Sequence, residues 1–353
     1  AVRSPGSTLK PLIYGLAFEA GIAHPESLIE DRPTAFAGYA PGNFDREFHG
    51  TVTVRQALQL SLNVPAVQVL DAVGPARLVS RMRRAGAAPV LADTSPPGLA
   101  IGLGGVGVTL EDLVAIYAAI ARGGTAVAIT DDLDRAPRPA DTRRVLDDRA
   151  AWYVSSILAG VPTPAKVSPG ELAFKTGTSY GYRDAWAVGF DGRHVVGVWV
   201  GRPDGVPVPG LAGIDAAAPI LIDAFARLGP LVPLRAAPQG ILVATSSDLP
   251  PPLKHVRNHR SHSAAAIPGP QIAFPPDGAR VELGPGAGAG VGLALKVRNG
   301  SPPFTWFANG APIDREPFMR TARWIPNGPG FATISVVDGR GQSSRVTVFL
   351  DAD

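Results

Sequence analysis

The sequence contains no cysteine, which excludes disulfide bonds, thiolate catalysis and cysteine-bound metal ions but leaves the redox compartment open. No apolar run reaches the roughly 18 residues that a membrane-spanning helix needs, and no signal peptide is visible. The net charge of +3 is small for 353 residues, so no basic patch indicates a nucleic-acid partner. Hydrophobic residues make up 45% of the chain, which is enough for a sizeable core.

Glycine (41) and proline (36) are abundant, and they indicate many turns and at least one linker in a chain long enough for two domains. In residues 1–230, many helices precede an antiparallel sheet and a last helix, which is typical of an α+β domain. Residues 231–267 lose periodicity and are rich in Pro, Ser and Arg, so we predict a linker. Residues 268–353 contain short strands between Asn-Gly and Asp-Gly turns and predict a small all-β sandwich.

Ser7 and Lys10 stand at the start of a predicted helix. Pro11 fixes this start, because a residue without an N–H group is tolerated only in the first turn. A spacing of three places Ser7 and Lys10 on one face, one turn apart, as a hydroxyl nucleophile and its amine base require. A lone pair of this kind is more often a helix cap and a surface lysine, so its interpretation depends on other motifs.

Two further polar motifs follow along the chain. Ser61 and Asn63 lie in a loop that we predict directly after a helix over residues 51–60. A predicted strand over residues 172–178 ends in the third motif, Lys175, Thr176, Gly177 and Thr178. Each motif is weak alone, but the three together, each in a fitting local context, predict one catalytic site.

The remaining polar patterns have structural interpretations. Residues 102–107 are glycine-rich but lack the Lys-Ser/Thr pair of a phosphate-binding loop, so we predict a turn before a helix. The arginines of a predicted helix over residues 75–85 are interpreted as a solvated face. His255, His259 and His262 could bind a metal, but they have no acidic or cysteine partners, so we expect neither a metal site nor a cofactor.

The motifs and their flanking residues resemble the penicilloyl-serine transferases, a group that includes class A β-lactamases and penicillin-binding proteins. Residues 3–11, 39–45 and 184–190 look like a class A penicillin-binding protein. The 1C kind is favoured, because it carries a small β domain after its transpeptidase domain. The resemblance covers residues 1–230 closely and residues 265–353 more loosely.

This resemblance implies a serine-type D-Ala-D-Ala transpeptidase that cross-links peptidoglycan stem peptides and is also acylated by β-lactam antibiotics. Ser7 would attack the penultimate carbonyl, and Lys10 would take its proton. Asn63 would hold Lys10 and the substrate amide. Ser61 would pass the proton to the leaving D-Ala amine, and Lys175 would keep that serine oriented.

The third motif would bind the substrate, as the family does. The terminal carboxylate of the stem peptide needs a cation and hydroxyl groups, which Lys175, Thr176 and Thr178 offer. Gly177 stands between the two threonines in this substrate-binding segment. The oxyanion would lie between the backbone N–H groups of Ser7 and Thr178.

The resemblance also implies parts that this sequence does not contain. The chain opens with three residues before Ser4 and no initiator methionine, so we expect a fragment of a longer protein. That protein would carry an N-terminal membrane anchor and a glycosyltransferase domain at the periplasmic face of the bacterial inner membrane. The family's sheet takes two of its strands from before the Ser-x-x-Lys helix, so we expect one sheet edge to lack its partner. Cell-envelope proteins are possible partners of the C-terminal β domain.

Two alternative functions stay open at this point. The first is a D,D-carboxypeptidase or β-lactamase on the same scaffold. We prefer the transpeptidase, because Glu111 is a predicted helix cap and no other acidic motif between Ser61 and Lys175 resembles a β-lactamase glutamate. The second is a non-catalytic binding scaffold, against which the intact set of three motifs argues.

Overall fold

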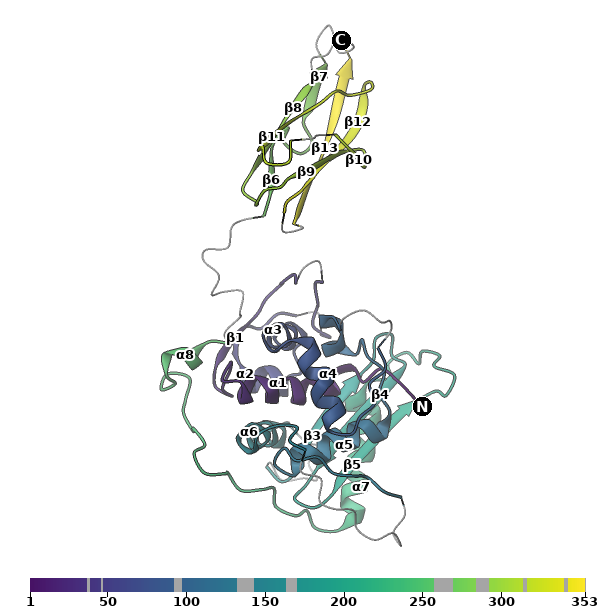
Figure 1. The fold of residues 1–353 in the computed structure, drawn as a ribbon. Helices are drawn as coiled ribbons and strands as arrows, with labels where there is room; N and C mark the ends of the chain where they lie inside the picture. The colour runs from purple at the N-terminus through teal and green to yellow at the C-terminus, as the bar shows by residue number, and fades with distance from the viewer. Residues whose placement is uncertain are drawn as a thin grey trace. The chain divides into compact units, whose positions relative to one another are not determined.

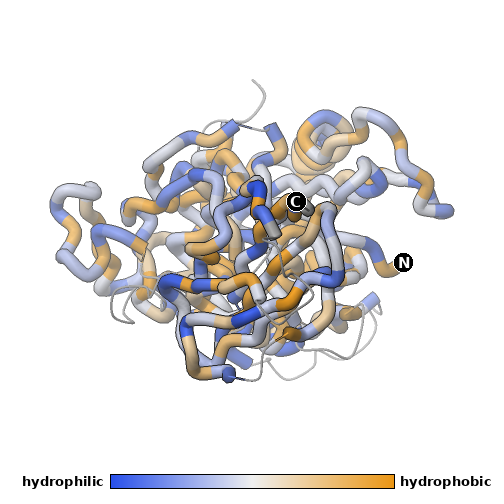
Figure 2. The backbone as a smooth tube through the Cα atoms, turned by 90° about the horizontal axis from the view of Figure 1, so that it is seen from above, coloured by the Kyte–Doolittle hydropathy of each residue, from blue (hydrophilic) through white to orange (hydrophobic). Residues whose placement is uncertain are grey.

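The computed structural model divides the chain into two compact units, residues 1–259 and 260–353. Along the backbone, short hydrophobic and hydrophilic stretches alternate (Figure 2). Among the described residues, no helix combines the length and the apolar composition that a bilayer crossing requires. The structure describes residues 1–36, 39–45, 47–91, 97–131, 143–162, 170–256, 269–283, 292–313, 316–339 and 342–352.

The first unit is an α+β fold, as the sequence predicts (Figure 1). Its helices are α1 (Lys10–Glu19), α2 (Val54–Gln59), α3 (Asn63–Val73), α4 (Pro75–Arg84), α5 (Leu110–Ala121), α6 (Asp148–Ala159), α7 (Ala218–Leu228) and the short α8 (Pro251–Lys254). Tighter or wider helical turns occur at η1 (Gly6–Leu9), η2 (Leu99–Leu103) and η3 (Gly213–Ala217). Its strands are β1 (Leu28–Asp31), β2 (Gly50–Thr53), β3 (Ala173–Thr178), β4 (Asp184–Phe190) and β5 (Val195–Gly201).

The sheet β3-β4-β5 is antiparallel and is covered by helices on both faces (Figure 1). Because side chains alternate along a strand, Ala185 and Ala187 of β4 pack with α7, whereas Trp186 and Val188 join the core built on α1, α3, α5 and α6. In the described part of the chain, β3 and β5 each pair with β4 alone. The helix α1 is buried along almost its whole length, which places its first residues in the centre of the unit.

Two local expectations are wrong. The predicted helix over residues 51–60 begins as strand β2, which pairs with β1, and only then does Thr53 cap α2 with a capping box. The arginines of α4 are not all solvated. Arg77 and Arg81 bind the carboxylate of Glu19 at 2.9 and 2.6 Å, because α4 packs beside the end of α1.

Residues 230–256 follow the surface of the first unit, although the sequence predicts a linker from residue 231. Leu242 accepts a hydrogen bond from Tyr153 at 2.8 Å and contacts His24 at 3.0 Å. The N–H of Val256 donates to Leu28 of β1 at 3.0 Å. Composition did not reveal these contacts, because single backbone and side-chain hydrogen bonds leave no periodic signal. The rest of the predicted linker, residues 257–267, lies outside the described residues.

The second unit is the predicted small β-sandwich. Sheet β10-β9-β12-β13-β7 and sheet β11-β8-β6 enclose a core that includes Trp306, Ile334 and Leu350. Its strands are β6 (Gln271–Phe274), β7 (Arg280–Leu283), β8 (Leu293–Arg298), β9 (Thr305–Ala308), β10 (Ala311–Pro312), β11 (Thr321–Trp324), β12 (Gly330–Val337) and β13 (Ser343–Ala352). Trp306 is 1% exposed, as expected of a core residue.

Candidate active site

The first motif lies on a tight turn that runs directly into α1. Ser7 belongs to η1 and is half-buried, and Lys10 is the completely buried first residue of α1. Gly6 has φ +53°, and a Cβ there would lie 2.4 Å from the carbonyl oxygen of Thr178. Only glycine therefore lets this turn approach β3 so closely. The Trp186 indole anchors the turn by donating to the carbonyl of Ser4 at 2.8 Å.

The Lys10 amine meets the second motif. It donates to the Ser61 carbonyl at 2.5 Å and to the Asn63 side-chain oxygen at 2.7 Å, and the Ser61 hydroxyl lies 3.4 Å away. Ser61 has φ +61°, a left-handed conformation that is strained for a residue with a Cβ. The strained backbone turns its hydroxyl and its carbonyl toward the same amine.

The third motif forms the end of β3 and lies against η1. A Cβ on Gly177 would lie 2.6 Å from the carbonyl of Pro5, so the two segments touch backbone to backbone. The Thr178 hydroxyl accepts the N–H of Gly213 at 2.9 Å, which fixes the end of the strand. The Lys175 amine donates to the carbonyl of Thr176 at 2.8 Å. All three predicted motifs therefore meet at the start of α1.

Two buried amines share this site. Burial lowers the pKa of Lys10 well below 10.5, the Lys175 charge lowers it further, and the Asp31 carboxylate opposes both effects. Burial alone lowers the pKa of Lys175 from 10.5 to about 7. Near neutral pH the site can therefore hold one neutral amine, which is a base, beside a cationic one.

Sequence reasoning missed Asn43, which touches the second motif, and Asp31, which binds Asn43. Asp31 ends β1 and is completely buried, and Asn43 is 7% exposed and contacts both Asp31 and Asn63. Asn43 stands in a segment used for the family resemblance, but no local pattern indicates its partner, because Asn43 lies in a loop and Asp31 ends strand β1, twelve residues earlier.

The glycine-rich residues 102–107 form the predicted turn, and they also support the first motif. Gly104 has φ +103°, and its carbonyl accepts the Ser4 hydroxyl at 2.8 Å. Of the predicted histidine cluster, His259 and His262 lie outside the described residues.

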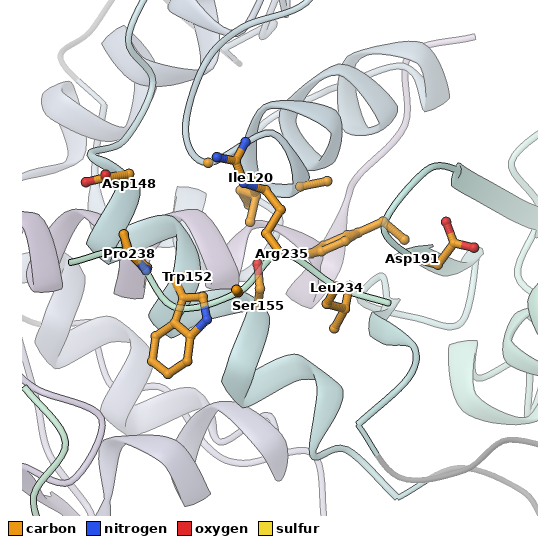
Figure 3. A pocket seen from close by; sticks show the side chains of 12 residues that line it. Ile120, Asp148, Trp152, Ser155, Asp191, Leu234, Arg235 and Pro238 are labelled. Carbon is orange, nitrogen blue, oxygen red and sulfur yellow. The ribbon is translucent and has the colours of Figure 1, made fainter. Parts of the chain in front are cut away.

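A cavity of about 90 Å³ lies in the first unit between α5, α6, the end of β4 and the segment 234–238. Figure 3 shows Trp152, Ser155 and Arg235 around it. Arg235 donates to the carbonyl of Arg122 at the end of α5 at 2.9 Å, so it has a structural role there. None of the three motifs contributes a residue to this cavity.

Comparison with known protein families identifies both parts of the chain. Residues 1–202, more than half of the chain, match the penicillin binding protein transpeptidase domain. The chain belongs to this family. Residues 259–348 match the penicillin-binding protein C-terminus family, so both units have known relatives.

Individual relatives show which kind of penicillin-binding protein this chain resembles. Penicillin-binding protein 1C of Escherichia coli is 47% identical over 225 residues, which are 63% of this chain and 29% of that protein. The chain therefore spans less than a third of this relative's length. The predicted resemblance to the 1C kind of penicillin-binding protein is confirmed by this match and by the C-terminal family.

Solved structures share the fold of the first unit. The penicillin-binding protein PonA1 of Mycobacterium tuberculosis superposes with a TM-score of 0.60 at 22% identity, over 69% of this chain and 72% of PonA1. Penicillin-binding protein A of M. tuberculosis, solved as a ceftriaxone acyl-enzyme complex, gives a TM-score of 0.53 at 23% identity, over 65% of this chain and 61% of that one. The predicted fold class is thereby confirmed.

Proposed function

We propose that the chain is the D,D-transpeptidase part of a peptidoglycan-synthesising enzyme and that it acts through an acyl-enzyme on Ser7. The observation that carries the proposal is the contact of the buried Lys10 amine with Ser61 and Asn63, one turn from Ser7. Membership of the transpeptidase family supports it, as does the ceftriaxone acyl-enzyme of a protein with the same fold.

Acylation begins when Lys10 removes the proton of the Ser7 hydroxyl. The Ser7 oxygen then attacks the carbonyl of the penultimate D-Ala of a stem peptide. Lys10 can do this because burial and the Lys175 charge hold its pKa low, so that a neutral amine is available. As the tetrahedral intermediate collapses, the proton that Lys10 took from Ser7 passes through the Ser61 hydroxyl to the departing D-Ala amine, with Lys175 orienting that hydroxyl.

The oxyanion and the substrate carboxylate bind along β3. The backbone N–H groups of Ser7 and Thr178 hold the oxyanion, and fixed donors of this kind contribute about 3 kcal/mol each to the transition state. Lys175, Thr176 and Thr178 bind the terminal carboxylate. Gly177 supports this arrangement, because only a residue without a side chain lets β3 lie against the turn that carries Ser7.

The second half of the reaction transfers the acyl group. An amine of a neighbouring stem peptide attacks the Ser7 ester, which restores the Ser7 hydroxyl and forms the cross-link. A β-lactam would acylate Ser7 in the same way and remain attached. In the whole protein, we place this chain at the periplasmic face of the inner membrane, after a membrane anchor and a glycosyltransferase domain. We propose that its C-terminal β domain binds other cell-envelope proteins.

Fluorescent penicillin tests the assignment of Ser7. We expect the chain to be labelled stoichiometrically on the peptide that contains Ser7, and the Ser7→Ala variant to remain unlabelled, because alanine offers no oxygen for the ester. Peptide mapping identifies the acylated residue. Equal labelling of both proteins would contradict the proposal, and rapid turnover of a chromogenic cephalosporin would favour a hydrolase instead.

A further inference from the structure

Asp31 is a buried carboxylate that the acylation steps above do not use. Its oxygens accept the side-chain amide of Asn43 at 2.9 and 2.8 Å, and one of them also accepts the backbone N–H of His49 at 2.8 Å. Burial of a carboxylate costs free energy unless hydrogen bonds replace its water. Here these bonds lead, through Asn43, to the second motif.

The contacts of the Asn43 amide fix its orientation. Its nitrogen faces Asp31 and donates to the carbonyl of Glu47 at 2.8 Å, while its oxygen accepts the backbone N–H of Asn63 at 2.7 Å. Helix α3 begins at Asn63, and its N-cap residue Leu62 provides no side-chain cap. Asn43 therefore supplies the cap of α3 from a distant part of the chain.

The same loop fixes the side chain of Asn63. Its nitrogen donates to the carbonyl of Gly42 at 2.8 Å, so its oxygen points to the Lys10 amine, which donates to it at 2.7 Å. A flipped Asn63 amide would lose its bond to Gly42, because two oxygen acceptors would then face each other, and it would turn its nitrogen, instead of its oxygen, to the Lys10 amine. The orientation that Lys10 requires thus depends on the loop that Asp31 anchors.

We propose that Asp31 and Asn43 are positioning residues that hold Asn63, and through it the Lys10 amine, in the arrangement that acylation of Ser7 needs. Asn43 acts by capping α3 and orienting Asn63. Asp31 acts by fixing the Asn43 amide and by placing a negative charge near the Lys10 amine. The inference rests on the proposed acyl-enzyme function and assigns it two further residues.

The charged groups near Lys10 change its pKa in opposite directions, and this distinguishes the role of Asp31 from that of Asn43. Asp31 raises the pKa of Lys10, whereas Lys175, on β3, lowers it. Tyr14, on α1, also faces Asp31, and burial keeps the pKa of this phenol above its usual range, so it stays neutral. Loss of the Asp31 charge therefore lowers the pKa of Lys10, a change that the loss of a merely structural residue does not produce.

Three variants test the two roles by the rate of acylation with fluorescent penicillin between pH 5 and 10. Asn43→Ala should slow acylation by roughly a hundredfold at every pH, because Asn63 is no longer oriented. Asp31→Asn should move the rising limb of the pH profile down by about one pH unit and lower its plateau. The exchange Asp31→Asn with Asn43→Asp restores an amide–carboxylate pair and should recover part of the lost rate.

The matched control is Asp191→Asn. Asp191 is also a buried carboxylate, and it accepts backbone N–H groups from His194 and Val232. It follows the end of β4 that pairs with the start of β3, whereas the third motif ends at Thr178, opposite the other end of β4. This variant should lower the melting temperature and leave the pH limb in place. NMR titration of ¹³C-labelled lysine, with the Lys10 signal assigned by Lys10→Arg, reports the Lys10 pKa without any acylation.

Three outcomes would overturn the positioning roles: a wild-type Lys10 pKa and pH limb in Asp31→Asn, a wild-type acylation rate in Asn43→Ala, or no rescue by the exchanged pair. Failure of the proposed function is distinguishable from these. It would appear as equal labelling of the wild type and Ser7→Ala, while the NMR shift of Lys10 in Asp31→Asn would still be present.

Discussion

At the scale of single residues, the site is defined by two lysines that the fold removes from water. Neither Lys10 nor Lys175 has a carboxylate as its hydrogen-bond partner among the described residues, and their contacts are carbonyls, a hydroxyl and an amide. Such partners satisfy the N–H groups without stabilising the charge as an ion pair would, so burial keeps both pKa values low. The two amines to which we assign the chemistry thus also cost stability.

This cost predicts how stability depends on pH. The pKa of Lys175 is about 7 in the folded state against 10.5 when exposed, so between these values the unfolded state binds more protons. The penalty is absent above pH 10.5, grows as the pH falls and is complete below about 7. Lys175→Met should therefore raise the melting temperature relative to the wild type, by more at pH 6 than at pH 10, while penicillin labelling is lost.

Calorimetry at several pH values measures this difference. The control is Lys254→Met, because Lys254 lies partly exposed on α8 and its replacement should change the melting temperature equally at every pH. A Lys175→Met variant that is less stable than the wild type at pH 6 would show that the charged amine has stabilising contacts.

At the scale of elements, α1 is held at both ends. Its first residue meets the second motif, and its last, Glu19, joins α4 and the start of α6. The Glu19 carboxylate accepts from Arg77 and Arg81 and from the backbone N–H of Asp147 at 2.9 Å. Since the Glu19 and Arg81 side chains are only 15% and 16% exposed, this cluster is screened less than a surface ion pair.

Glu19→Gln should therefore destabilise the first unit by about 1–3 kcal/mol, because Arg81 keeps its charge in a partly buried place without a counter-charge. Urea unfolding measures the change. Acylation per folded molecule should not change, since Glu19 lies at the opposite end of α1 from Lys10.

The matched control for this variant is Glu30→Gln. Glu30 pairs with Arg32 at 2.6 Å, but both side chains are largely exposed, so no measurable loss of stability is expected. Equal urea midpoints for the two variants would show that the Glu19 cluster contributes no more than a surface pair.

At the scale of the whole molecule, the two units have separate cores. The hydrophobic cluster around Trp306 and Ile334 contains residues of the second unit only, and the clusters that support the motifs contain residues of the first. We therefore predict that a loss of stability in the core of the second unit leaves the proposed site in the first unit unchanged.

Ile334→Ala tests this separation. Ile334 is completely buried on β12, so its truncation should destabilise the second unit by about 2–5 kcal/mol. Calorimetry should show the transition of the second unit at a lower temperature, with the rate of penicillin acylation unchanged. Ser335→Ala, the neighbouring residue on the opposite side of β12, is the control and should have little effect. A slower acylation in Ile334→Ala would reveal coupling between the units.

Much of the fold and of the site could be predicted from the sequence, because the signals are local. Pro11 and the helical spacing around it place the start of α1, and the third motif lies on β3 as expected. The predicted helix over residues 51–60 failed in its first residues, because β2 exists only through pairing with β1, a partner that no local pattern reveals.

The sequence by itself thus determined where the proposed catalytic residues stand: Ser7, Lys10, Ser61, Asn63 and Lys175 belong to motifs whose spacing is readable along the chain. Tertiary structure alone decided how these residues are held. The cap that Asn43 gives to α3, the charge of Asp31 behind Lys10 and the clamp of Glu19 on Arg81 join segments far apart in sequence. Such contacts depend on how buried polar groups are satisfied across the packed core, and this is settled only when the chain folds.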